Sequence, residues 1–97
     1  PADVAYSVAS VSTTYSETAT AGTKIVSCDT TGGTFTVTLP TAVGNKATIV
    51  VKKSAGAPNL TVDGAGSETI DGGLTAVLVR VNESITLVSN NSNWLII

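Results

Sequence analysis

Apolar and polar residues alternate with a period of two along several short segments of this chain. Phe35, Val37 and Leu39 alternate with threonine, and Leu60 and Val62 repeat the pattern with polar neighbours. Successive side chains of a β-strand point to opposite faces, so this pattern is typical of a strand with one buried face. No segment carries apolar residues at helical spacing over three turns. Thr, Val and Ile, the β-branched residues that favour strands, make up 35 of the 97 residues. The sequence predicts an all-β chain.

Glycine, proline and asparagine divide the chain into short strands. Gly32-Gly33 predicts a hairpin that joins residues 24–29 to 34–39, and Pro40 ends the second strand because it cannot donate to a ladder. Further strands are expected at residues 47–53, 59–63, 68–70, 74–81, 84–89 and 94–97. About eight strands at this spacing predict a small antiparallel β-sandwich or a barrel-like body.

The first part of the chain differs from the rest. Residues 1–22 consist mostly of Ala, Ser, Thr and Val, and their only charges are Asp3 and Glu17. This weakly apolar segment suits either one or two strands or an extended arm that becomes ordered on a partner. We expect an arm that leads into a strand near residues 11–15, followed by the β body over residues 23–97.

Charge is scarce along the whole chain. Charged residues make up 12% of the sequence, about half the ~25% usual in soluble domains. In residues 74–81 both alternating sets are largely apolar, and residues 94–97 are all apolar. A small antiparallel domain has too little chain to cover both sides of such strands. We therefore expect a second copy of the chain or a host structure to cover one side, and we favour self-association. The residues expected at this contact between copies are Leu74, Ala76, Leu78, Leu95 and Ile97.

Composition also argues against several functional classes. The chain has no histidine, so Ser-His-Asp and Cys-His catalysis and zinc sites of the Cys/His kind are excluded. A net charge of −2 does not suit nucleic-acid binding, which uses a basic stripe. No signal peptide or transmembrane run is visible in the sequence. We therefore expect no enzymatic activity, no cofactor, no nucleic-acid partner and no membrane insertion.

Acidic residues gather at Asp63, Glu68 and Asp71. The segment from Asp63 does not match a calcium-binding loop, because Ala65 and Leu74 occupy the third and twelfth positions, where oxygen ligands are needed. We expect no metal site, and we expect these side chains to cap turns through local hydrogen bonds.

Three further features have structural interpretations. Cys28, the only cysteine, lies in a strand-like segment and is expected to be buried and unreactive. Trp94 lies in an apolar terminus and is expected in the core rather than on a sugar-binding surface. Lys46, Lys52 and Lys53 form the one basic cluster, which we interpret as a solvated strand end or otherwise as an interface contact.

Over residues 23–97 the order of motifs resembles a β module of tailed-bacteriophage virion proteins. Such modules occur in tail fibres, head fibres and small capsid-decoration proteins. The residues that carry the resemblance are Thr36-Val-Thr-Leu-Pro40, Gly44-Asn-Lys-Ala-Thr-Ile-Val-Val-Lys-Lys53, Leu60-Thr-Val-Asp63, Glu68-Thr-Ile-Asp-Gly72, Ser84-Ile-Thr-Leu-Val-Ser89 and Asn93-Trp-Leu-Ile-Ile97.

The resemblance implies a non-enzymatic homotrimer on the virion surface, assembled in the host cytoplasm. A capsid-decoration or head-fibre protein of this kind would bind the major capsid protein, or another virion protein, through its N-terminal arm. One alternative is a receptor-binding module of a tail fibre that recognises the host surface. Another is a bacterial surface adhesin or pilin-like domain. The expected attachment residues are Ala2, Asp3, Val4, Ala5, Tyr6 and Val8.

Overall fold

The computed structural model describes residues 6–97, which form nine β-strands and no helix. The expectation of an all-β chain is confirmed. Within the described part of the chain, no helix is long and apolar enough to cross a membrane. The strands are β1 (Tyr6–Val11), β2 (Tyr15–Ser16), β3 (Thr23–Asp29), β4 (Phe35–Thr38), β5 (Thr48–Ala55), β6 (Leu60–Asp63), β7 (Thr75–Leu78), β8 (Ser84–Ser89) and β9 (Trp94–Ile96).

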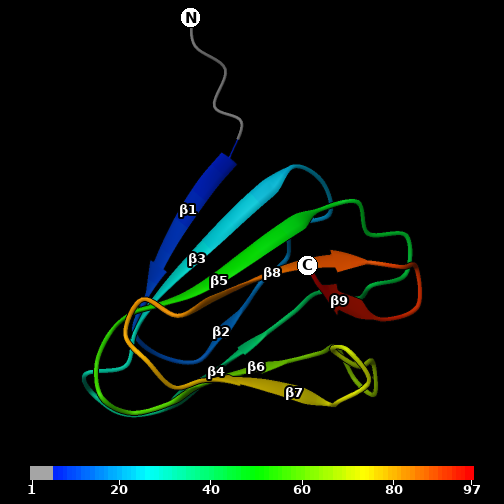
Figure 1. Ribbon diagram of the computed structural model, residues 1–97. Coiled ribbons are helices and arrows are strands. Elements are labelled where there is room, and N and C mark those ends of the chain that lie inside the picture. Colours follow the sequence, from blue (N-terminus) through cyan, green and yellow to red (C-terminus); the bar gives the residue numbers. More distant parts are fainter. Residues whose placement is uncertain (1–5) are drawn as a thin grey trace, which may run out of the picture.

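These strands form two sheets that enclose the core (Figure 1). The first sheet has five strands in the order β1-β3-β5-β8-β9, and the second has four in the order β2-β4-β6-β7. Strands β1, β3 and β5 are parallel, and so are β2, β4 and β6. The last three strands pair antiparallel with their neighbours: β7 with β6, β8 with β5, and β9 with β8. Both sheets are therefore mixed, and the prediction of an antiparallel domain is wrong for the first six strands.

The parallel pairs arise because the chain winds as a coil, alternating between the two sheets from β1 to β6. Val26 pairs with Val51 in the first sheet, and Val37 pairs with Val62 in the second, so the second coil takes 25 residues. The first coil is shorter, because Val8 pairs with Ile25 and Tyr15 with Val37. Parallel neighbours need a crossover of a dozen residues or more. Here each crossover contains a strand of the opposite sheet instead of a helix.

The predicted hairpin at Gly32-Gly33 is also wrong. Strands β3 and β4, which flank this turn, lie in different sheets and do not pair. Gly33 has a φ of 139°, which suits glycine. A turn signal shows that the chain changes direction, and it does not show whether the next strand pairs with the last or crosses to the facing sheet.

The described part of the predicted N-terminal arm belongs to the sheets. Strand β1 pairs with β3 along six residues, from Tyr6 beside Thr23 to Val11 beside Cys28. Strand β2 pairs with β4, and the expected strand at residues 11–15 is replaced by these two strands and the bend between them. Four of the expected attachment residues lie outside the described residues: Ala2, Asp3, Val4 and Ala5.

The core lies between the sheets and contains the apolar residues that the alternation predicts to point inward. Phe35, Val37 and Leu39 are all buried. Trp94 is 0% exposed, and its Nε1–H donates to the carbonyl of Pro40 at 3.1 Å, which confirms its place in the core. Burying one large apolar side chain contributes about 1.5–3 kcal/mol, and the indole keeps a partner for its one polar group.

Candidate interaction surface

The five-stranded sheet has an inner face against the core and an outer face that no described part of the chain covers. Val26, Val51 and Leu87 are 0% exposed, so they define the inner face of β3, β5 and β8. Neighbouring residues in each strand point the other way. The apolar side chains that point outward are Tyr6, Val8, Ile25, Val50, Val88, Leu95 and Ile97. We call this surface the outer face.

The register aligns these side chains across the sheet. Val8 lies beside Ile25, Ile25 beside Val50, and Val50 opposite Thr86. The Ile97 N–H donates to the Thr86 carbonyl at 2.9 Å, which places Ile97 at the far end of the same row. A row of large aliphatic side chains, interrupted only by a threonine, thus crosses the whole sheet.

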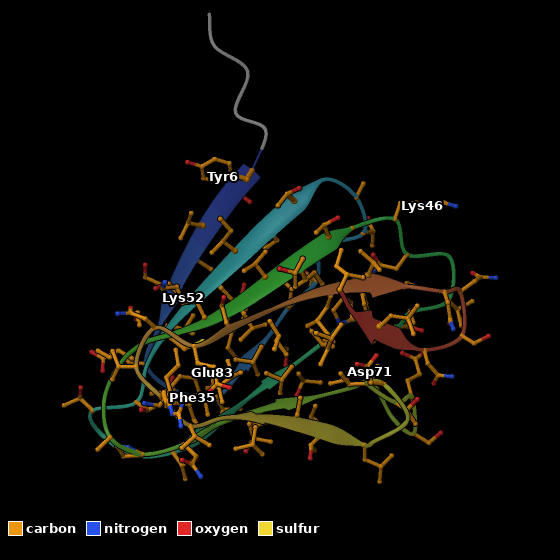
Figure 2. All side chains as sticks on the ribbon, in the orientation of Figure 1. Tyr6, Phe35, Lys46, Lys52, Asp71 and Glu83 are labelled. Atoms are coloured by element: carbon orange, nitrogen blue, oxygen red, sulfur yellow. The ribbon has the colours of Figure 1, made fainter. Side chains whose placement is uncertain are left out.

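Charge on the outer face is confined to one end. The neighbouring row is polar, with Ser10, Ser27, Lys52 and Ser84 in register across four strands. Tyr6 extends from the start of β1 and Lys52 from β5 (Figure 2). Among the strand residues that the structure describes, Asp29 and Lys52 are the charged side chains in outward register on this sheet.

Four residues predicted from the sequence for two different contacts lie on this one face, at its opposite edges. Tyr6 and Val8, expected in an attachment arm, lie on the β1 edge and are each 53% exposed. Leu95 and Ile97, expected in a trimer interface, lie at the β9 edge and are 38% and 74% exposed. That these two pairs share one face could not be predicted from the sequence, because only the order of the strands in the sheet shows it.

A second exposed apolar surface follows β7 into the next loop. We call it the β7 ridge, and it contains Leu74, Val77, Val79 and Val81. Strand β7 is apolar on both faces, as the sequence predicts, but the interface residues chosen from it are partly wrong. Leu78 is 1% exposed, so it is in the core of its own chain, and Ala76 packs against that core. Leu74 is exposed as expected.

The loop after β7 is held by Glu83. Its Oε1 accepts the backbone N–H groups of Arg80 at 3.0 Å and of Val79 at 2.7 Å, and these bonds lower the pKa of the carboxyl below its ordinary value. Residues 79–83 line a hollow of about 620 Å³. Because the carboxylate is occupied by its own loop, its role in this hollow is structural.

The acidic residues singled out from the sequence also hold the chain together. Glu68 accepts the Thr41 hydroxyl at 2.7 Å and the Ala42 N–H at 2.8 Å. Asp71 accepts the N–H of Ile96 at 3.0 Å. These bonds join distant segments, so the expectation of local turn capping is wrong for both residues. In residues 6–97 no group of three His, Cys, Asp or Glu residues could hold a metal ion.

Cys28 is 0% exposed and lies on the inner face, which confirms that it is buried. Burial raises the pKa of its thiol to about 11. A thiol that stays protonated at neutral pH is a poor nucleophile. Cys28 therefore acts as a small core residue.

Lys53 contradicts the expectation of a solvated basic cluster. It follows Ile49 and Val51 in the same phase of β5, and it is 0% exposed. Its ammonium group donates to the carbonyl of Gly56. The neighbouring Lys52 points to the outer face. Three lysines close in sequence thus do not form one basic surface.

Glu17 is a buried charge that sequence reasoning missed. It is 3% exposed and accepts the N–H groups of Thr18 and Ala19 and the hydroxyl of Tyr15, at 2.8–3.1 Å. Its own N–H donates to the Thr38 carbonyl of β4. Burial, and then the bond to Glu17, raise the pKa of Tyr15. The side-chain bonds order residues 15–19, and the bond to Thr38 extends the pairing of β2 with β4.

Comparison of the chain with family models, with curated proteins and with solved structures finds no match. The surfaces of the molecule are therefore the basis for assigning a function. The polar side chains of Glu17, Lys53, Glu68, Asp71 and Glu83 form hydrogen bonds within the chain. The outer face is an apolar surface that no described part of the chain covers.

Proposed function

We propose that this chain is a non-enzymatic structural module that associates with copies of itself. We further propose that it forms a homotrimeric capsid-decoration or head-fibre protein on the surface of a tailed-bacteriophage virion. The order of motifs over residues 23–97 supports the virion assignment through its resemblance to such modules. The outer face supports the self-association independently of that resemblance.

The observation that carries the proposal is the apolar row across the outer face. Large exposed apolar patches mark interaction sites in soluble proteins. Val8 and Ile97, at the two ends of the row, are 53% and 74% exposed. Charged surface residues keep copies of a protein from associating. With 12% charged residues, this chain has few of them to prevent contact between two such faces. Covering this face with further copies removes both problems.

Decoration would act by mass action. A protein that binds the assembled lattice and not the separate capsid subunits stabilises the lattice in proportion to the logarithm of its free concentration over Kd. Three linked copies add avidity, because the second and third contacts become intramolecular. This mechanism needs no catalytic group.

The first test is the mass of the purified chain, measured by light scattering after size exclusion. We expect a mass near three times 9.7 kDa, because the outer face is then covered. A monomer at micromolar concentrations would contradict the proposal.

Attachment to the capsid is tested with a truncation that ends before β1. Removing residues 1–22 would delete β1 and β2 and uncover the core, so the informative variant lacks residues 1–5. We expect this variant to keep the mass of the full chain and to lose binding to capsids in a sedimentation assay. Unchanged capsid binding would contradict attachment through the residues that precede β1.

A further inference from the structure

We infer that copies of this chain contact each other through the outer face of the five-stranded sheet and not through the β7 ridge. This inference rests on the proposed self-association and names the surface that performs it. Both surfaces are apolar and exposed, so the choice between them depends on area, charge and the position of the apolar residues.

Area favours the outer face. Strands lie about 4.8 Å apart and rise about 3.3 Å per residue, so five strands over six residues span roughly 24 by 20 Å, or about 480 Å². In a closed ring of three, each copy divides its face between two neighbours, so the three contacts together bury about 1,400 Å². This total exceeds the roughly 1,000 Å² that a specific interface needs. The β7 ridge is one strand wide and about eight residues long, roughly 130 Å². It is too narrow to hold two copies together by itself.

Charge points to the same surface. In the outer face the apolar row is separate from Asp29 and Lys52, which lie toward one end of the sheet. The loop of the β7 ridge carries Arg80 and Glu83 among its valines. The centre of an interface is depleted in charged residues, and charges are tolerated at its rim. The outer face has this arrangement and the ridge does not.

The occupant we assign to the face is a second copy of this chain, for two reasons. One acid and one base on the face leave no net charge that would favour a strongly charged partner of another kind. In addition, apolar side chains stand at both edges, with Val8 on β1 and Ile97 beyond β9. In a closed ring of three, the β1 half of one face meets the β9 half of the next. Apolar residues at both edges are what this contact needs.

Two matched pairs of variants test the inference. Val8→Lys and Val77→Lys change the same residue type on edge strands of the two sheets, at positions 53% and 47% exposed. Ile97→Lys and Leu74→Lys form a second pair outside regular strands, at positions 74% and 60% exposed. Because all four side chains are substantially exposed in one chain, the fold should tolerate each substitution. Circular dichroism and the urea midpoint check that it does.

The readout is the dissociation constant of the assembly, from sedimentation equilibrium over a range of concentrations. We expect Val8→Lys and Ile97→Lys each to raise it at least about tenfold, because each removes an apolar contact and buries a charge. We expect Val77→Lys and Leu74→Lys to change it less than about threefold. The Ile97 pair carries the test if Val8→Lys unfolds.

The outcomes separate the inference from the proposed function. If the unaltered chain assembles and only the β7-ridge variants weaken it, the inference is wrong while self-association stands. Equal effects from both surfaces, or no effect from either, also overturn the inference. A monomeric unaltered chain overturns the proposed function and the inference with it.

Discussion

Gly56 occupies a position where one added methyl group should be costly, and the structure gives the size of the cost. Its φ is +99°, and a Cβ at this position would stand 2.5 Å from the carbonyl carbon of Thr30 and the amide nitrogen of Thr31. These are backbone atoms, which cannot rotate away as a side chain could. The Thr30 hydroxyl also bonds to the carbonyls of Ala55 and Pro58 on either side of the glycine, which holds the two segments together.

Gly56→Ala therefore has two costs. The left-handed backbone costs about 1–2 kcal/mol for a residue with a Cβ, and the close contact adds about 1–3 kcal/mol as overpacking. Gly44→Ala is the matched control, because Gly44 has a φ of +70° and open space around its Cβ position. We expect Gly56→Ala to lower the free energy of unfolding by about 2–5 kcal/mol, and Gly44→Ala by about 1–2 kcal/mol.

Urea denaturation measures both values, with all proteins at one protomer concentration because assembly contributes to apparent stability. The two variants differ by the overpacking cost of about 1–3 kcal/mol. At a slope of about 1–1.5 kcal/mol per molar urea, their midpoints should differ by at least about 0.7 M. Equal losses for the two variants would refute the argument that the approach of Gly56 to the Thr30–Thr31 backbone matters.

Two other predictions concern buried ionisable groups. Burial raises the pKa of the Cys28 thiol from its ordinary value of 9.0 to about 11, so the unfolded chain loses this proton before the folded one does. The contribution of this thiol to the free energy of unfolding is fully present below pH 9 and is lost as the pH rises through 11, by about 2–3 kcal/mol. Subtracting the pH profile of Cys28→Ala from that of the unaltered chain should isolate it, and parallel profiles would refute it. For Glu17, replacement by Ala leaves two backbone N–H groups and one hydroxyl without their partner, and we expect a loss of about 2–4 kcal/mol. Glu17→Gln keeps an acceptor and should lose less than half as much in the same urea titration, whereas equal losses would contradict this account.

Most of the strands could be predicted from the sequence, because their signal is local. Alternation at Phe35, Val37 and Leu39 records which side chains are buried, and the structure buries all three. The same alternation cannot show which strands are neighbours. A strand with one buried face looks alike in a hairpin and in a coil that crosses to the other sheet, so the parallel pairing was missed.

A short repeat in the sequence does indicate the parallel pairing of β4 with β6. Residues 35–38 read Phe-Thr-Val-Thr and residues 60–63 read Leu-Thr-Val-Asp, 25 positions later, and these segments are parallel neighbours. Their likeness identifies successive coils, as internal repeats do in other repeat architectures.

The candidate surface was only partly predictable. In residues 74–81 both faces are apolar, so nothing local shows that Leu78 points inward and Val77 outward. The alternation of β5 could have shown that Lys53 is buried, because it has the same phase as Ile49 and Val51. The positive charge of Lys53 led instead to the prediction of a solvated side chain. A single buried cation is costly enough to be rare, and here the Gly56 carbonyl receives it.

The coiled path of the chain also governs how such a protein can change its length. A duplication of residues 23–47 contains one strand of each sheet and both crossings, so it would lengthen both layers by one strand and preserve every existing register. A single residue inserted within β5 would instead turn the side chains that follow to the opposite face, taking Lys53 out of the core and Lys52 into it. The fold should therefore accept the insertion of a whole coil, in the way that repeat proteins gain and lose units. Insertions of a single residue should be accepted only in the segments that cross between the sheets.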